Sequence, residues 1–364
     1  MSDPLIRVEH LYKVFGNAPG SVMPMVRDGR SKNDILAETG HTVALRDISL
    51  EIEAGSIFVV MGLSGSGKST LIRHFNRLIE PTEGAIHVDG TDVMSLSPTG
   101  LEAFRRNKMS MVFQRFALMP HRTVLENVAY GLTVRKVPRA ERTEKASEWV
   151  RTVGLDGYEN HYPAQLSGGE QQRVGLARAL CTDPDILLMD EAFSALDPLI
   201  RSGMQDQLIA LQERLRKTIV FITHDLDEAL RLGDKIAILK DGMVSQVGRP
   251  QEILLEPADD YVTAFVRDVN RARVLTVGMV MKPAGTPSTA TDIADGPTLR
   301  PNTILQDALP VTVNSDHPVP VVSEDGEFMG TLSKHDIVAI LANSNAEPSG
   351  KDDPQHERTI IPCM

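Results

Sequence analysis

The clearest pattern of apolar and polar positions lies between residues 57 and 79. The run Ile57–Val60 is continuously apolar, as in a strand that is buried on both faces. Apolar residues then recur three or four positions apart, which is the spacing of one helix face: Leu71, Ile72, Phe75, Leu78 and Ile79. Glycines and serines separate the two segments, so the pattern predicts a strand, a tight loop and a helix.

Two more apolar runs downstream end in polar residues. Ile186–Met189 leads into Asp190 and Glu191, and Ile219–Thr223 leads into His224. Short apolar runs separated by longer stretches of helical spacing are typical of βαβ units around a parallel sheet. We therefore expect an α/β fold whose strands end in ionisable side chains.

The character of the chain changes after residue 270. Residues 281–302 are rich in Pro, Thr, Ala and Gly, and beyond them the order helix, strand ("PVPVV"), turn, strand ("FMGTL") and helix ("KHDIVAIL") is predicted. We expect one domain over 1–270 with a mostly helical subdomain at about 95–175. A linker over 271–302, a small α/β module over 303–343 (with an alternative start near 275) and a polar tail over 344–364 would follow.

Composition narrows the classes of protein. The chain has 364 residues, 41% of them hydrophobic and 24% charged, which is typical of a water-soluble globular protein. No run approaches 18 apolar residues, the start lacks a secretory pattern, and Cys181 and Cys363 have no metal-ligand spacing. These features predict a cytoplasmic protein. The net charge of −11 argues against a nucleic-acid partner.

The loop after the first strand matches the P-loop pattern G-x-x-x-x-G-K-[ST]. Its glycines allow successive backbone N–H groups to face phosphate oxygens, and the following helix adds its partial positive charge. Lys68 would contact the β- and γ-phosphates, and Ser69 would bind Mg²⁺. We expect ATP to be held by Gly62, Leu63, Ser64, Gly65, Ser66, Gly67, Lys68, Ser69 and Thr70.

The acidic pair at residues 190 and 191 complements this loop. A carboxylate at the end of a neighbouring strand can hold Mg²⁺, which is the role expected of Asp190. A second carboxylate directly after it can take a proton from the attacking water, which is the role expected of Glu191. Two acids after an apolar run are weak evidence alone, but the P-loop makes the catalytic interpretation the stronger one.

A third motif, "LSGGEQQRVGLARAL" at 166–180, carries a resemblance to a known family. Ser167 occupies a helix N-cap position, and an apolar stripe follows at Leu176, Ala177 and Leu180. Together with the P-loop, the acidic pair, Gln114 in "VFQRFALMP", "SALD" at 194–197 and "FITHD", this chain resembles an ATP-binding cassette (ABC) ATPase over residues 5 to about 270. The resemblance implies a RecA-like core with a helical subdomain and an antiparallel β subdomain.

The resemblance also implies residue roles. Phe15 would stack on adenine, although a core phenylalanine at the end of the first strand is the alternative. Gln114 would contact Mg²⁺ or the attacking water, and His224 would hydrogen-bond the γ-phosphate. Two copies would enclose two ATP molecules, each copy offering its signature turn to the other's nucleotide: Leu166, Ser167, Gly168, Gly169 and Glu170. The loop joining the two sites would be Ser194, Ala195, Leu196 and Asp197.

Within the family, the chain is similar to ATP-binding subunits of glycine betaine/L-proline importers. Ala192 follows the catalytic glutamate where most ABC proteins have proline, and a helix-like insert follows Gly16. Such transporters import glycine betaine, choline, proline betaine or related amines. The implied partners are membrane permease subunits and, indirectly, a periplasmic or extracellular amine-binding protein. The chain would lie on the cytoplasmic face of the inner membrane, docked through Phe116, Leu118 and Met119, although a place in the core of the helical subdomain is the alternative for these side chains.

The C-terminal module resembles a cystathionine-β-synthase (CBS) domain, present as one convincing copy. It would pair with its twin across the dimer and sense ionic strength or a nucleotide. A dimerisation module without a ligand is the alternative, because Ser333, His335 and Asp336 match a nucleotide-binding pattern only loosely.

Three other functions compete with this interpretation. An importer for trimethylamine N-oxide, or for another amine or amino acid, is the nearest rival. A DNA-repair or chromosome-structuring ATPase is disfavoured, because the gap between P-loop and signature is only about a hundred residues and has no heptads. A non-catalytic ATP-binding regulator is disfavoured by the presence of Glu191 and His224.

Overall fold

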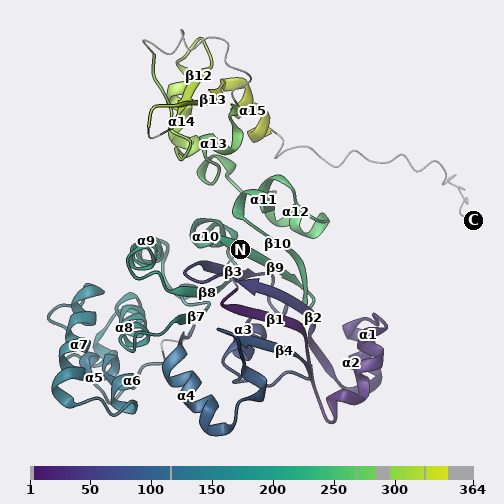
Figure 1. The fold of residues 1–364 in the computed structure, drawn as a ribbon, viewed down its shortest axis with the longest axis vertical. Helices are drawn as coiled ribbons and strands as arrows, with labels where there is room; N and C mark the ends of the chain where they lie inside the picture. The colour runs from purple at the N-terminus through teal and green to yellow at the C-terminus, as the bar shows by residue number, and fades with distance from the viewer. Residues whose placement is uncertain (1–3, 115–116, 268, 284–295, 324, 343–364) are drawn as a thin grey trace, which may run out of the picture. The chain divides into compact units, whose positions relative to one another are not determined.

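The computed structural model describes residues 4–114, 117–267, 269–283, 296–323 and 325–342. These residues form two compact units, and the chain divides into them between Val266 and Arg267. The first unit contains the motifs, and each unit is described separately (Figure 1).

A six-stranded sheet forms the centre of the first unit, in the order β10-β9-β3-β8-β7-β6. Its strands are parallel except for β10, which runs antiparallel to β9. The bounds are β3 Ile57–Met61, β6 Met109–Val112, β7 Ile186–Asp190, β8 Thr218–Thr223, β9 Lys235–Lys240 and β10 Met243–Gly248. The predicted strands at 57–60, 186–189 and 219–223 are confirmed.

A second, antiparallel sheet has the order β2-β1-β4-β5. Its strands are β1 Ile6–Phe15, β2 Thr42–Ile52, β4 Glu83–Val88 and β5 Thr91–Asp92, with the short helix η2 Val93–Ser95 after them. Helix α3 (Lys68–Phe75) is buried between the two sheets, because Leu71, Ile72 and Phe75 belong to one apolar cluster with residues of both. This packing fixes the P-loop, which directly precedes α3.

The helix after the P-loop is shorter than its apolar spacing predicts. It ends at Phe75, and Leu78 is 52% exposed. Arg77 adopts a left-handed conformation (φ 50°), which ends the helical path, and the Leu78 N–H donates to Asn76 Oδ1. The prediction that Leu78 and Ile79 continue this helix is therefore wrong.

The helical subdomain forms its own apolar cluster between Val124 and Cys181. It contains α5 Val124–Val128, α6 Tyr130–Val134, α7 Arg139–Thr152, η3 Pro163–Gln165 and α8 Gly168–Leu180. The expected start near 95 is too early, because Phe104 of α4 (Pro98–Lys108) and Met109 of β6 pack in the cluster between the sheets. Figure 1 shows α5 to α8 gathered together beside the end of β7.

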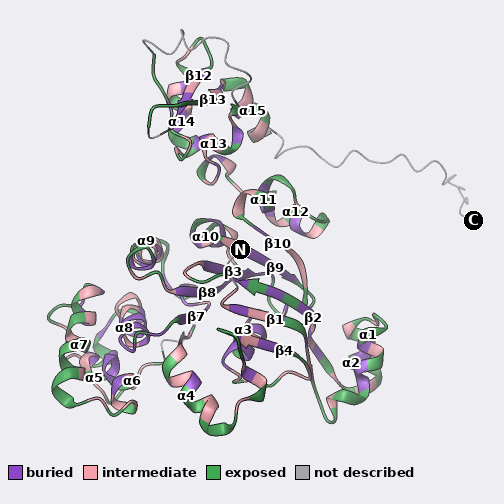
Figure 2. Ribbon diagram, viewed as in Figure 1, coloured by how far each residue is buried: buried purple, intermediate pink, exposed green. Residues whose placement is uncertain are grey.

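The predicted helix-like insert after Gly16 is present as η1 Pro19–Val22, α1 Met23–Arg27 and α2 Lys32–Thr39. It packs on β1 and β2 through a small cluster that includes Val14, Met23, Ile35 and Val43. The other helices of the first unit are α9 Pro198–Leu215, α10 Leu226–Leu232, α11 Pro250–Leu255 and α12 Asp260–Val266. Figure 2 shows the inner strands β3, β8 and β7 of the central sheet buried, whereas the edge strand β10 is partly exposed.

The second unit contains a three-stranded sheet in the order β11-β13-β12. Its elements are η4 Arg271–Arg273, α13 Val277–Val280, β11 Lys282–Pro283, α14 Leu305–Val313, β12 Val319–Val322, β13 Phe328–Leu332 and α15 Lys334–Ala342. The predicted strand–turn–strand–helix order is confirmed. The segment expected to be a linker over 271–302 is structured over 271–283, since β11 pairs with β13. The module therefore begins earlier than 303, and the tail at 344–364 lies outside the described residues.

Candidate functional site

The P-loop connects β3 to α3 and has the geometry of a phosphate-binding loop. Gly62, Gly65 and Gly67 all have positive φ, in the range that favours glycine. A Cβ at Gly67 would lie 2.8 Å from the carbonyl oxygen of Ala44 on β2, and one at Gly62 would lie 2.2 Å from that of Leu239 on β9. Gly62 and Gly67 are therefore required by close backbone contacts as well as by the turn itself, whereas Gly65 is required only by its positive φ.

Lys68 is held at this loop by two backbone groups. Its Nζ donates to the carbonyl oxygens of Gly62 (2.8 Å) and Leu63 (3.0 Å), and the residue is only 5% exposed. An ammonium group has three donors, so one remains for a phosphate oxygen. Burial lowers the pKa of Lys68, and the carboxylates of Glu191 and Asp190 oppose that shift.

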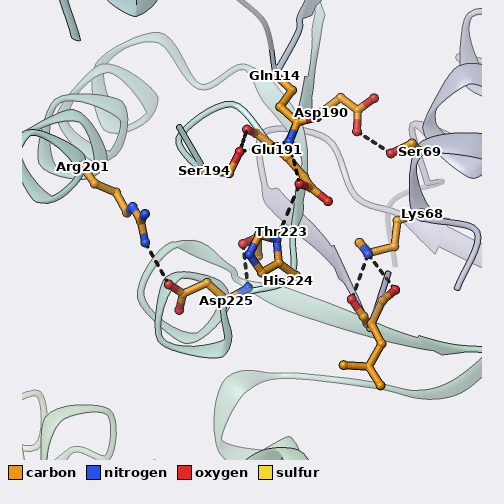
Figure 3. A network of polar contacts seen from close by, with 12 residues as sticks. Lys68, Ser69, Gln114, Asp190, Glu191, Ser194, Arg201, Thr223, His224 and Asp225 are labelled. Carbon is orange, nitrogen blue, oxygen red and sulfur yellow. Dashed lines mark hydrogen bonds and ion pairs between the residues drawn. The ribbon is translucent and has the colours of Figure 1, made fainter. Parts of the chain in front are cut away.

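Ser69 and Asp190 are in direct contact, as the sequence predicts for two ligands of one ion. Ser69 Oγ donates to Asp190 Oδ1 at 2.8 Å (Figure 3). Arg73 NH2 lies 3.3 Å from Asp190 Oδ2. Arg73 was not predicted. It lies four residues after Ser69 and therefore on the same face of α3, a spacing that could have indicated it.

Glu191 lies at the centre of the polar network. Its Oε2 accepts from Gln114 Nε2 (3.1 Å) and lies 3.5 Å from His224 Nδ1 (Figure 3). The backbone of Glu191 has φ 46°, a strained conformation for a residue with a side chain. It is fixed by its own N–H, which donates to Ile222 O at 3.1 Å, and by Ser194 Oγ, which donates to its carbonyl at 2.9 Å. The three residues predicted to be catalytic are thus brought together.

A cavity of about 320 Å³ lies over the P-loop. Phe15 lines it and is 42% exposed, so the alternative of a core phenylalanine does not hold. The other residues that line the cavity are Thr42, Val43, Ala44, Ser64, Gly65, Gly67, Lys68, Ser69, Thr70 and Glu191. Thr42–Ala44 were not predicted, because no local pattern indicates that β2 passes beside the P-loop.

The signature turn begins helix α8 in the predicted way. Ser167 Oγ accepts from the Glu170 N–H (3.3 Å), and Glu170 Oε2 accepts from the Ser167 N–H (2.7 Å), which forms a capping box. Hydrogen bonds from the Ser167 backbone and hydroxyl lower the pKa of Glu170. A Cβ at Gly169 would lie 2.6 Å from Ile200 Cγ2. Among the described residues that line the P-loop cavity, none belongs to 166–170.

The loop at 194–197 joins Glu191 to helix α9. Asp197 caps α9 by accepting from the Ile200 N–H at 3.1 Å, and Leu196 is buried. Gln114 Nε2 also donates to Ser194 Oγ at 3.3 Å. This loop therefore contacts the same glutamine as Glu191 does.

Comparisons with known proteins identify the family to which the chain belongs. The model of the ABC transporter family matches residues 45–194. The glycine betaine transport ATP-binding protein OpuAA of Bacillus subtilis is 57% identical over 281 residues, which cover 77% of this chain and 67% of that protein. The chain belongs to the ATP-binding subunits of ABC transporters. It is accordingly an ATP-binding and ATP-hydrolysing protein.

Two more relatives match this ABC subunit over almost its whole length. The glycine betaine/proline betaine protein ProV of Salmonella typhimurium is 48% identical, over 96% of this chain and 86% of that protein. The trimethylamine N-oxide protein TmoW of Ruegeria pomeroyi is 45% identical, over 95% of this chain and 99% of that protein. Among solved structures, the dimeric ATP-binding cassette MJ0796 bound to ADP and Pi is 33% identical (TM-score 0.58), covering 67% of this chain and 98% of that one.

Proposed function

We propose that this ABC subunit energises uptake of glycine betaine, choline, proline betaine or a related quaternary or trimethylated amine. The observation that carries the proposal is the 57% identity with a glycine betaine transport protein. A trimethylamine N-oxide importer is the second candidate, favoured by an alignment that covers 99% of TmoW. None of the roles proposed below places a residue of this chain against the amine.

We assign the chemistry as follows. The P-loop and Lys68 hold the phosphates, and Phe15 stacks on adenine. Glu191 takes a proton from the water that attacks the γ-phosphorus, while the bond to the bridging oxygen breaks and ADP leaves. His224 hydrogen-bonds the γ-phosphate.

The group at Ser69 suits Mg²⁺. Hydroxyl, carboxylate and amide oxygens from Ser69, Asp190 and Gln114 are the oxygen ligands that Mg²⁺ prefers, usually together with substrate phosphates and water. When bound, Mg²⁺ would neutralise phosphate charge. The Ser69–Asp190 hydrogen bond of 2.8 Å brings two of these donors to one point.

We propose further that two copies bind two ATP molecules between them. This is supported by the position of the signature turn, which does not line the cavity of its own chain in the described residues. Ser167 and Gly169 would then contact the γ-phosphate that the other copy holds. The capping box uses the N–H groups of Ser167 and Glu170, so the N–H groups of Gly168 and Gly169 are those that the described contacts leave at the start of α8 for a phosphate.

This dimer can be tested with Glu191→Gln. The substitution keeps the size of the side chain but removes the proton acceptor, so kcat should fall about 100-fold or more while ATP still binds. With ATP, the variant should elute as a dimer in size-exclusion chromatography. Adding Ser167→Arg to the same variant should return it to a monomer. A monomer of Glu191→Gln with ATP bound would contradict the shared site.

The membrane permease is proposed to dock beside Gln114, which would place the chain on the cytoplasmic face of the membrane. Leu118 packs partly on the helical cluster, and Asn127 anchors the loop by donating to Met119 O at 3.1 Å. Phe116, the third residue of the expected docking surface, lies outside the described residues. In the described residues, no helix is long and apolar enough to span a bilayer.

For the C-terminal module we propose CBS-like pairing across the dimer. Asp336 accepts from the Ser333 N–H at 3.0 Å and pairs with Lys282 Nζ at 2.8 Å, while His335 is exposed. Because Asp336 is engaged inside the module, the alternative of a dimerisation module without a ligand gains support.

The amine can be identified by uptake. A strain that lacks this chain should be supplied with wild-type protein or with Lys68→Ala, and uptake of labelled glycine betaine, choline and trimethylamine N-oxide compared. Restored uptake of betaine or choline by wild type alone would support the main proposal. Restored uptake of only trimethylamine N-oxide would replace it with the second candidate, and no difference for any amine would refute both.

A further inference from the structure

Arg201 joins two loops that lie on either side of Glu191. It is the fourth residue of α9, and its guanidinium group is divided between two partners. NH1 lies 3.2 Å from Asp225 Oδ2, and NH2 donates to the carbonyl oxygen of Leu196 at 3.2 Å. Leu196 belongs to the 194–197 loop, and Asp225 directly follows His224 (Figure 3).

Each loop also contacts the catalytic glutamate. On one side, Ser194 Oγ donates to the Glu191 carbonyl at 2.9 Å. On the other side, His224 Nδ1 lies 3.5 Å from Glu191 Oε2. Arg201 therefore closes a ring of contacts that runs from Glu191 through one loop, across the guanidinium and back through the other loop.

We infer that Arg201 is a positioning residue for ATP hydrolysis, which holds the 194–197 loop and His224 in register around Glu191 without touching the nucleotide. The inference rests on the proposed role of Glu191 as the base. A planar guanidinium presents its donors in a fixed fork, so one side chain sets the distance between the two loops.

Asp225 cannot adjust to the loss of this partner by rotating freely. Its Oδ1 accepts from the Glu228 N–H at 3.2 Å and so caps α10, and its own N–H donates to Thr223 Oγ1 at 3.0 Å. Oδ2 is thus the oxygen left for Arg201. Without the guanidinium, Asp225 would keep its place in the α10 cap, but the 194–197 loop would lose its tie to the His224 loop.

Arg231 provides a matched control. It also joins α9 to α10, because NH1 donates to Ser202 Oγ (3.0 Å) and Gln205 Oε1 (2.9 Å), and NH2 to Asp206 Oδ1 (2.5 Å). None of these partners belongs to the 194–197 loop or follows His224. Loss of Arg231 should therefore weaken the same helix pair without releasing either loop.

The test compares Arg201→Gln, Arg201→Lys and Arg231→Gln in the full-length chain. Both Arg201 variants should lower kcat by about 10- to 100-fold, because small misplacements of catalytic groups cost that much. The KM for ATP should stay within about threefold, since the P-loop is untouched. Arg201→Lys keeps the charge but reaches only one partner, so it should not restore kcat. Arg231→Gln should keep kcat within about threefold while its melting temperature falls as far as that of Arg201→Gln.

A double-mutant cycle adds a second readout. Asp225→Asn retains the α10 cap but weakens the pair with Arg201, so its effect on kcat should nearly vanish in the Arg201→Gln background. Equal losses of kcat in Arg201→Gln and Arg231→Gln, or additive losses in the cycle, would overturn the inference. If Arg201→Gln does not fold, Arg201→Lys carries the same comparison. If the Glu191→Gln variant hydrolysed ATP at the wild-type rate, that result would instead refute the proposed role of Glu191 as the base.

Discussion

Gly62 offers a direct test of how tightly the P-loop is built. Its φ is +146°, and a Cβ there would lie 2.2 Å from Leu239 O and 2.8 Å from Ser66 Oγ. Leu239 lies on β9, whose backbone is paired with β3 on one side and β10 on the other. Because that carbonyl cannot move alone, Gly62→Ala must displace the start of the P-loop by about 1 Å to reach an ordinary contact distance.

The expected size of the effect follows from a comparison with Gly65. Gly65 also has positive φ (+80°), but its Cβ would meet nothing within 4 Å. Gly65→Ala should therefore cost only the left-handed backbone penalty, about 1 kcal/mol. Gly62→Ala adds overpacking against rigid backbone, which typically costs about 1–3 kcal/mol more. We expect a difference of about 2 kcal/mol between the two variants.

The assay is urea unfolding of the nucleotide-free chain, followed by circular dichroism and by the fluorescence of Trp149, which is the single tryptophan of the sequence and lies in the first unit. Stability without nucleotide is compared because a methyl group at residue 65 would face the phosphates. If the two variants lost the same free energy of unfolding, within about 0.5 kcal/mol, the close contact with Leu239 would not be a real constraint.

Two further predictions concern charge and exposure. Burial holds the pKa of His74 at about 4. Because the unfolded chain binds this proton near pH 6.5, the folded state loses stability as pH falls from about 6.5 towards 4, by about 2 kcal/mol at pH 5. His74→Gln should lose that part of the acid sensitivity in unfolding at pH 7.5 and pH 5, and an unchanged pH dependence would contradict the buried neutral imidazole. Phe15→Ala should weaken ATP binding by about 5- to 100-fold, the worth of base stacking. Because Phe15 is 42% exposed, the free energy of unfolding of the Phe15→Ala variant should hardly differ from that of the wild type. If a titration gave the variant and the wild type equal affinity for ATP, Phe15 would not be part of the site.

Sequence patterns predicted the strands and the loop chemistry well because both are local. β3 and β7 are continuous apolar runs, and each leads directly into residues that we assign to the site: the P-loop after β3, and Asp190 and Glu191 at the end of β7. Periodicity failed at Leu78, where the conformation of Arg77 ends the helix although the apolar spacing continues. It also failed to show that α4 and β6 belong to the core, since a helix packed in a core and one in a helical subdomain have the same spacing.

The parts of the site that depend on distant segments could not be predicted. Thr42–Ala44 line the cavity over the P-loop only because β2 passes beside that loop in the folded chain. Similarly, the module's first strand, β11, has only two residues and is recognisable only by its pairing with β13. Neither segment has a motif, so its place follows from tertiary structure alone.

Arg201 and Arg231 show why the network around the proposed base, Glu191, is harder to predict from the sequence than Glu191 itself. Both are arginines on neighbouring helices, and both have a carboxylate partner, Asp225 and Asp206 respectively. The sequence patterns do not distinguish one arginine from the other. The difference is geometric: one guanidinium reaches Leu196 O and the residue after His224, whereas the other contacts only side chains of α9. In the proposed mechanism the motif residues carry out the chemistry, and the contacts between their loops hold them in position. The kcat values should therefore distinguish the Arg201 variant from the Arg231 variant, although their melting temperatures should not.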